Sequence, residues 1–67
     1  MTAYVRPVYA SGLWSAVVHD GTTELWRSES SADRVDVMSD AFSHAMAFMP
    51  ERLVLEDYRP EVDEAAA

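Results

Sequence analysis

The dipeptide Asp20-Gly21 constrains the fold of this chain more than any other feature, because it separates two segments of strand-like composition. Both central residues of a type I′ turn need positive φ, and Asp-Gly is among the pairs that adopt this two-residue hairpin loop most readily. The flanking segments, LWSAVVH (13–19) and TTELWRS (22–28), are rich in β-branched and aromatic residues. The sequence therefore predicts an antiparallel hairpin over residues 13–28.

A two-residue loop at Asp20-Gly21 also determines which side chains share a face of the hairpin. It would place Val18 opposite Thr23 and Trp26 on the outer, exposed face. Because side chains alternate along a strand, a shift of one residue would reverse every assignment. On this register the predicted core face consists of Trp14, Ala16, Val18 and Leu25.

Two further segments have strand composition. AYVRPVYA (3–10) is rich in Tyr and Val and ends at a Ser-Gly turn, whereas RLVLEDY (52–58) places Leu53 and Leu55 on one face. Pro7 lacks a backbone N–H, which favours an edge position for the first strand.

A helix is predicted over residues 31–49. Ser30 or Ser31 can cap its first N–H groups, and Pro50 ends it. At about 100° per residue, Asp33, Asp36, Asp40 and His44 lie on the solvent side. The stripe predicted to pack on the sheet contains Val35, Met38, Phe42, Ala45, Met46 and Met49.

The resulting order, β-β-β-α-β, predicts an α+β fold. An antiparallel three-strand meander, one helix and a fourth strand would form two layers. Residues 1–59 would form a single domain, and 60–67 a flexible acidic C-terminal tail with few apolar anchors. A chain of 67 residues buries only about 60% of its unfolded surface, so its stability is expected to be marginal.

Negative charge is concentrated in the second half of the chain. Residues 1–28 hold two acids and two arginines, which leaves ten of the twelve acids and three of the five arginines in residues 29–67. This asymmetry favours a basic partner over direct nucleic-acid binding, because phosphate contacts require positive charge. The simpler alternative is that a net charge of -7 serves solubility.

Several classes of protein are excluded by composition. The absence of cysteine excludes disulfide scaffolds, thiol nucleophiles and cysteine metal sites. No apolar run approaches the ~20 residues of a membrane span. The N-terminus also lacks the charged-then-apolar pattern of a secretory signal. We expect a soluble protein in the cytoplasm of a bacterial host, without membrane contact, metal or cofactor.

The segment from Gly12 to Met46, followed by RLVLEDY, resembles the first half of the ribonuclease H-like fold, a truncated unit also used by the N-terminal domains of HicB-type antitoxins. Size, acidity and element order are in addition similar to small phage-encoded inhibitors of host defence, including anti-CRISPR proteins. In a ribonuclease H-like enzyme, carboxylates hold two metals. The resemblance would assign such roles to Asp36 and Asp57, but the first strand offers no carboxylate, so we expect no enzymatic activity.

Three carboxylates at spacings of three and four residues repel one another on a helix. We interpret this cost as the mark of a binding surface. The expected function is that of a non-enzymatic, DNA-mimicking inhibitor, anti-CRISPR-like, which occupies a basic nucleic-acid-binding groove, for example on a CRISPR surveillance complex. The residues expected to contact this partner are Asp33, Asp36, Asp40, Glu56, Asp57 and Trp26.

Alternatives remain open at the level of sequence. A HicB-like antitoxin or self-associating regulatory module would use sheet-edge pairing, and the chain would be a monomer or weak dimer. The acids could equally be a solvated face. Met38, Met46 and Met49, which are predicted to pack on the sheet, could alternatively form an adaptable binding stripe. Trp26 could equally be partly buried, beneath the tail or in a dimer seam.

Overall fold

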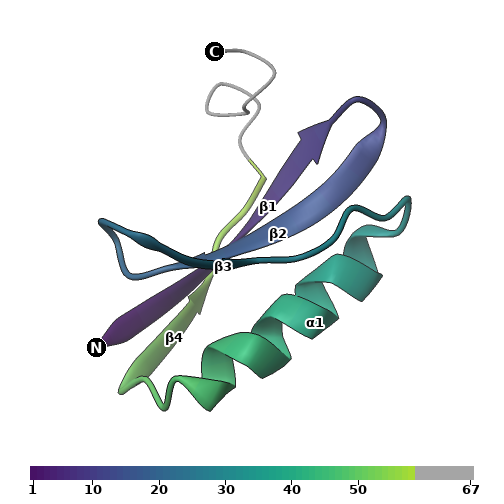
Figure 1. Cartoon of the computed structure of the whole chain (residues 1–67). Coiled ribbons are helices and arrows are strands. Elements are labelled where there is room, and N and C mark those ends of the chain that lie inside the picture. The colour runs from purple at the N-terminus through teal and green to yellow at the C-terminus, as the bar shows by residue number, and fades with distance from the viewer. Residues whose placement is uncertain (59–67) are drawn as a thin grey trace.

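The computed structural model describes residues 1–58, which form one four-stranded sheet with a single helix packed on one face (Figure 1). The sheet order is β3-β2-β1-β4, with antiparallel β1–β2 and β2–β3 pairs and with β4 parallel to β1. The predicted two-layer βββαβ fold is therefore confirmed, although the sheet is mixed. The predicted tail over 60–67 lies outside the described residues. The elements are β1 (Thr2–Ala10), β2 (Leu13–His19), β3 (Glu24–Arg27), α1 (Arg34–Ala47) and β4 (Arg52–Leu55).

Pro7 lies in a central strand, so the edge position predicted for β1 is wrong. The N–H of Glu56 donates to the carbonyl of Val5 at 2.8 Å, which shows that odd-numbered residues of β1 direct their backbone groups toward β4. Pro7 shares this orientation, but the β1–β4 register ends where Val5 meets Leu55. The missing N–H of Pro7 therefore costs the β1–β4 ladder no hydrogen bond.

The tight two-residue turn lies at the first hairpin. Ala10 pairs with Leu13, and the two loop residues Ser11 and Gly12 have φ values of 55° and 80°. Positive φ at both positions is the requirement of a type I′ turn.

The two-residue loop predicted at Asp20-Gly21 is wrong, because His19 pairs with Glu24 and the loop spans residues 20–23. The Asp20 carboxylate accepts hydrogen bonds from the N–H groups of Thr23 at 2.8 Å and Thr22 at 2.9 Å. These two bonds hold the pKa of Asp20 below its ordinary value of 3.8. The Asp side chain thus organises a wider turn than the Asp-Gly pattern indicates.

The longer loop changes the register of β3. A β-bulge between Val18 and His19 brings Trp26 opposite Val18, on the same face of the sheet. Trp26 therefore packs against the core, and its predicted exposure on the outer face is wrong. The predicted packing of Trp14, Ala16, Val18 and Leu25 against the core is confirmed.

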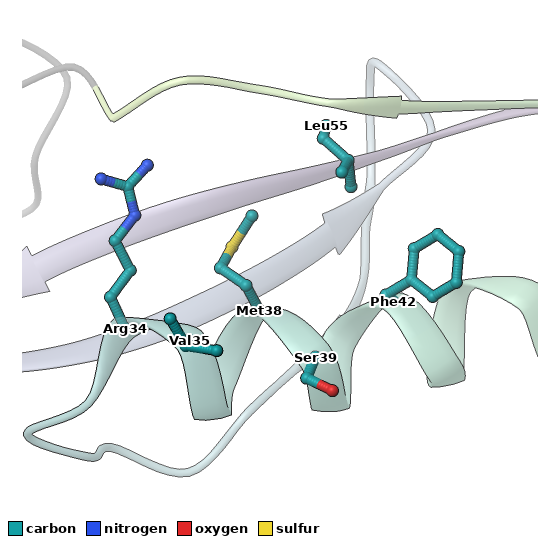
Figure 2. Close-up of a pocket in the computed structure, with 6 residues that line it drawn as sticks. All are labelled: Arg34, Val35, Met38, Ser39, Phe42 and Leu55. Carbon is teal, nitrogen blue, oxygen red and sulfur yellow. The ribbon is translucent and has the colours of Figure 1, made fainter.

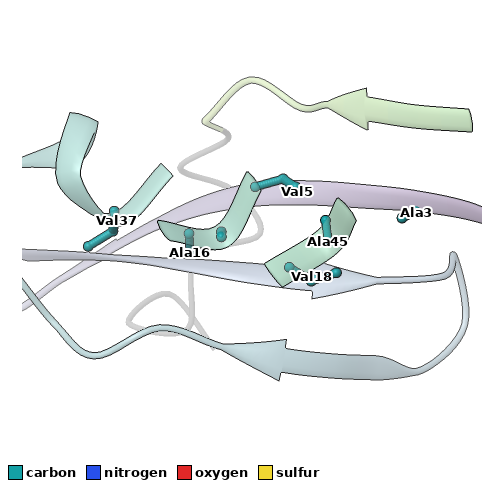
Figure 3. Packing of buried hydrophobic residues seen from close by; sticks show 7 residues of the cluster. Ala3, Val5, Ala16, Val18, Val37 and Ala45 are labelled. Atoms are coloured by element: carbon teal, nitrogen blue, oxygen red, sulfur yellow. The ribbon is translucent and has the colours of Figure 1, made fainter. Parts of the chain in front are cut away.

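The helix packs on the sheet through small side chains. Val37, Ala41 and Ala45 of α1 contact a sheet surface formed by Ala3, Val5, Ala16 and Val18. Figure 3 shows Val37 and Ala45 of the helix beside these four sheet residues. Methyl groups on both layers allow a close approach and dense packing of backbone against backbone.

The large apolar residues of the helix consequently lie beside the core, and most of the predicted sheet-facing stripe is wrong. Val35 is 73% exposed and Met49 is 88% exposed, while Phe42 and Met46 are also exposed. From that stripe only Ala45 is buried, and Met38 is half-buried.

Both ends of α1 lie inside the predicted range. Asp33, rather than Ser30 or Ser31, is the N-cap, and its carboxylate accepts a hydrogen bond from the N–H of Val35 at 2.9 Å. Ser31 instead pairs with Trp14 of β2 through two backbone hydrogen bonds. At the other end Met49 adopts a left-handed φ of 53°, directly before Pro50.

We predict that Ala41→Leu lowers the free energy of unfolding by about 1–3 kcal/mol, because Ala41 is fully buried against the sheet and overpacking forces the layers apart. The matched control is Ala47→Leu on the exposed side of α1, which should change it by less than about 0.5 kcal/mol. Urea denaturation of both variants measures this, and an equal or larger loss for Ala47→Leu would contradict the observed helix orientation.

We also predict that Met49→Gly raises the free energy of unfolding by about 0.5–1 kcal/mol, because glycine adopts positive φ without strain. The Met49 side chain is almost fully exposed, so its removal sacrifices little packing. The comparison is Met46→Gly inside α1, which should destabilise by about 1 kcal/mol in the same denaturation experiment.

Candidate functional site

The two flanks of α1 differ in chemical character. Val37, Ala41 and Ala45 form the buried centre of the helix. Because side chains advance by about 100° per residue, the flanks on either side of this centre carry separate sets. We call Asp33, Asp36 and Asp40 the acidic flank, and Val35, Met38, Phe42 and Met46 the apolar flank.

The acidic flank is exposed along its whole length. Two of its three residues, Asp33 and Asp36, also stabilise the start of the helix. Asp33 is the N-cap, and Asp36 lies in the first turn, where the helix dipole favours negative charge. Asp40 Oδ1 lies 3.8 Å from His44 Nε2. Within residues 1–58 none of these three carboxylates pairs with an arginine. The flank thus presents uncompensated negative charge to solvent.

Trp26 connects the acidic flank to the sheet. Its ring stacks on His44 with a centroid distance of 4.0 Å and an interplanar angle of 13°. Since His44 also neighbours Asp40, the acidic flank runs along the β3 side of the helix. Trp26 therefore lies next to the predicted acidic surface, as a half-buried support rather than an exposed anchor.

Glu56 and Asp57 do not extend the acidic flank. Glu56 Oε1 lies 2.7 Å from His19 Nε2, and His19 stacks on Tyr4 with a centroid distance of 5.0 Å. Tyr4 alternates with the core residues of β1, so this cluster lies on the sheet face opposite α1. Asp57 is exposed just beyond β4. The predicted site residues are therefore divided between opposite sides of the molecule.

The tautomer of His19 follows from its neighbours. The N–H of Gly21 donates to His19 Nδ1 at 3.0 Å, which leaves the proton of the neutral ring on Nε2. Nε2–H then donates to Glu56, so the tip of the β2–β3 hairpin is tied to the end of β4.

The sheet face opposite α1 also carries Arg6 and Arg27, whose positive charges equal in number the two acids of residues 1–28. Val17 pairs with Arg6 on one side and Arg27 on the other, so the two arginines occupy neighbouring strand positions on either side of one buried valine. Glu24 accepts hydrogen bonds from Arg27, which hold the pKa of Glu24 below its ordinary value of 4.5. The acids of the helix are therefore left without an arginine partner within residues 1–58, whereas the sheet face opposite α1 carries arginines and acids together.

The apolar flank lines a groove between α1 and β4 that was not predicted from the sequence. The groove has a volume of about 460 Å³, and Figure 2 shows Met38 and Phe42 directed from the helix toward Leu55 of β4. Leu55 is 59% exposed because α1 lies over β1 and β2 rather than over β4. The sequence contains one indication of this groove: the helix carries more large apolar residues than its buried face can cover. Its lining residues are Arg34, Val35, Met38, Ser39, Phe42 and Leu55.

Arg34, which lines the groove, also contacts a cluster of aromatic side chains. The Arg34 guanidinium lies 5.2 Å from the centroid of the Trp14 ring, a cation–π distance. Trp14 in turn packs edge-on against Tyr58 and tilted against Tyr9. These contacts fix the start of α1 and the segment after β4 against the same end of the sheet.

The described residues contain no cluster suited to a metal ion. Within residues 1–58 no group of three or more His, Asp or Glu side chains converges. Asp36, on the acidic flank, and Asp57, beyond β4, are therefore not joined by further ligands. Within residues 1–58, the helix α1 is too short and too polar to cross a bilayer.

Comparison with known proteins gives no assignment. No family model matches the chain, and no curated protein or solved structure matches it either.

We predict that Asp33→Ala lowers the free energy of unfolding by about 1 kcal/mol, whereas Asp33→Asn leaves it nearly unchanged, because Asn caps a helix as well as Asp does. Thermal or urea unfolding of both variants measures the difference. A loss of similar size in Asp33→Asn would show that the charge of Asp33, rather than its capping oxygen, stabilises α1.

Proposed function

We propose that this protein is a non-enzymatic binding protein whose acidic flank contacts a basic surface on a protein that handles nucleic acid. The observation that carries the proposal is the uncompensated charge of Asp33, Asp36 and Asp40, which are exposed and lack an arginine partner within residues 1–58. Such a surface would occupy arginine and lysine side chains that otherwise hold phosphates.

The spacing of these charges supports binding to a partner surface that otherwise holds phosphates. Asp33 to Asp40 spans roughly 10 Å along the helix axis. Duplex DNA carries one charge per about 1.7 Å of axis. The acidic flank therefore places its negative charges at a spacing of the same order as the phosphate charges of a duplex. A small acidic inhibitor of a host defence complex, such as a CRISPR surveillance complex in a bacterial host, would use its acids in this way.

The energetic cost of the acidic flank is small. Like charges at these spacings destabilise a helix by a few tenths of a kcal/mol per pair. The cap at Asp33 and the dipole near Asp36 offset part of this cost. A modest gain on binding is therefore enough to explain why the acids are tolerated.

A HicB-like antitoxin or self-associating regulatory module is the second candidate. It is favoured by a different feature, the exposed groove at the free edge of the sheet.

We predict that the double variant Asp36→Asn/Asp40→Asn keeps its fold but weakens capture of a basic partner, with the loss largest at low salt. Exposed charge pairs are screened over about 10 Å at 0.1 M salt. The partner is first captured on the wild-type protein from a bacterial lysate and eluted by a salt gradient. Affinity for the purified partner is then measured at two salt concentrations, with duplex DNA as a competitor.

The matched control is Glu29→Gln/Glu51→Gln, which removes the same number of charges from exposed positions outside α1. Capture that falls equally in both double variants would indicate a general charge effect. Capture that is unchanged in the α1 variant would show that the acids are only a solvated surface.

A further inference from the structure

Among the described residues 1–58, β4 has one edge without a partner strand, and its backbone groups there follow a simple pattern. It is the terminal strand of the sheet and pairs with β1 on one side only. Glu56 donates its N–H toward β1, so the even-numbered residues of this strand face β1. Backbone groups alternate in direction along a strand, so Leu53 and Leu55 direct their N–H and C=O groups outward, away from the sheet.

The apolar groove is continuous with this edge. Leu55 lies on its floor, and Met38 and Phe42 of α1 form the opposing wall (Figure 2). Within residues 1–58, the α1 side of β4 is therefore exposed at Leu55, where the outer backbone groups of the strand also have no partner strand. An exposed edge that adjoins an exposed apolar surface is a template for strand addition.

We propose that two copies of this chain form a symmetric dimer by antiparallel pairing of β4 with β4 of the second copy. The dimer would place Leu53 opposite Leu55 of the other copy, and Val54 opposite Val54. Both Leu53–Leu55 pairs are then hydrogen-bonded pairs, so all four outward backbone groups of each β4 are satisfied. This inference does not depend on the acidic flank; it develops the second candidate function, self-association through the edge of the sheet.

The side chains of β4 are self-complementary in this register. The two leucine pairs lie on the helix side, next to the groove, because Leu53 packs on the core and Leu55 lines the groove. On the opposite side Arg52 meets Glu56 of the other copy, and the symmetry repeats this pair of opposite charges. Because His19 contacts Oε1 of Glu56, the arginine of the other copy would bind Oε2. Arg52 makes no ion pair within residues 1–58. Shifting the register by two residues loses the charge pair and one set of leucine contacts.

The other edge of the sheet lacks these properties. The pairing of β3 with β2 is interrupted by the bulge between Val18 and His19, and bulges discourage strand addition. Its exposed ends carry Glu24 and Arg27, which already bond to each other. By contrast, the pairing of β4 with β1 is regular.

The dimer would merge the two grooves into one channel. With a strand spacing of about 4.8 Å and α1 centred over β1 and β2, the two helix axes would lie about 19 Å apart. Directly packed helices lie about 8–10 Å apart, so the helices do not touch. The leucine pairs form the floor between them, and Met38 and Phe42 of each copy form the walls.

The experiment is sedimentation velocity of the full chain at concentrations up to about 1 mM, the range of weak association. We expect a monomer–dimer equilibrium in the wild type. Leu55→Asp should raise the dimer dissociation constant by about tenfold or more, because it puts a charge on the central apolar contact. The matched control is Leu13→Asp, another exposed strand leucine (43% against 59% exposed) that lies far from β4.

Circular dichroism establishes that each variant is folded before the comparison. A wild type that stays monomeric at the highest concentration overturns the proposal, as does an equal effect of the two aspartate substitutions. A monomer that binds an apolar dye, with binding lost in Leu55→Asp, also overturns it and assigns the groove to a small apolar ligand.

The register has its own test. Arg52→Glu and Glu56→Arg should each weaken the dimer, and an equimolar mixture of the two variants should restore it, because each chain then meets opposite charge. Failure of the mixture to associate overturns the register. If Glu56→Arg does not fold, Arg52→Glu is compared with Arg52→Gln. The glutamate variant must dimerise less well, since it alone places a carboxylate against Glu56 of the other copy.

Discussion

The close approach of α1 to the sheet is the interaction on which the rest of the structure depends. Ala41 and Ala45 of the helix meet Ala3 and Ala16 of the sheet, and all four are fully buried. With methyl groups on both layers, the helix settles over β1 and β2 and cannot rotate without placing a larger side chain in the contact. Its orientation therefore decides what every other helical residue faces.

The two surfaces of functional interest follow from that orientation. The acidic flank lies on the β3 side, where His44 of α1 stacks on Trp26. The apolar flank lies on the β4 side, where it forms the groove with Leu55. Because these surfaces lie on opposite sides of the helix, association through β4 would leave the acidic flanks of both copies accessible. Self-association and binding of a basic partner are therefore compatible.

Parts of the fold could be predicted because they depend on neighbours in sequence. The element order, the core positions Trp14, Ala16 and Val18, and the end of the helix before Pro50 all follow from local composition and alternation. The turn at Asp20-Gly21 could not, because the Asp20 side chain accepts two backbone hydrogen bonds that compete with the two-residue turn. The resulting shift moved Trp26 to the core face.

The sequence by itself determined a βββαβ order, an acidic second half and an excess of large apolar residues on the helix. Only the tertiary structure decided which helical face is buried, that Glu56 binds His19 instead of joining the acidic flank, and that β1 is central despite Pro7. The physical reason is that periodicity identifies an amphipathic helix but not the depth at which it packs. Where the helix and the sheet approach closely, only small side chains such as alanine fit between them. A prediction from hydrophobicity alone instead buries the larger residues Val35, Phe42 and Met46, which the structure leaves exposed.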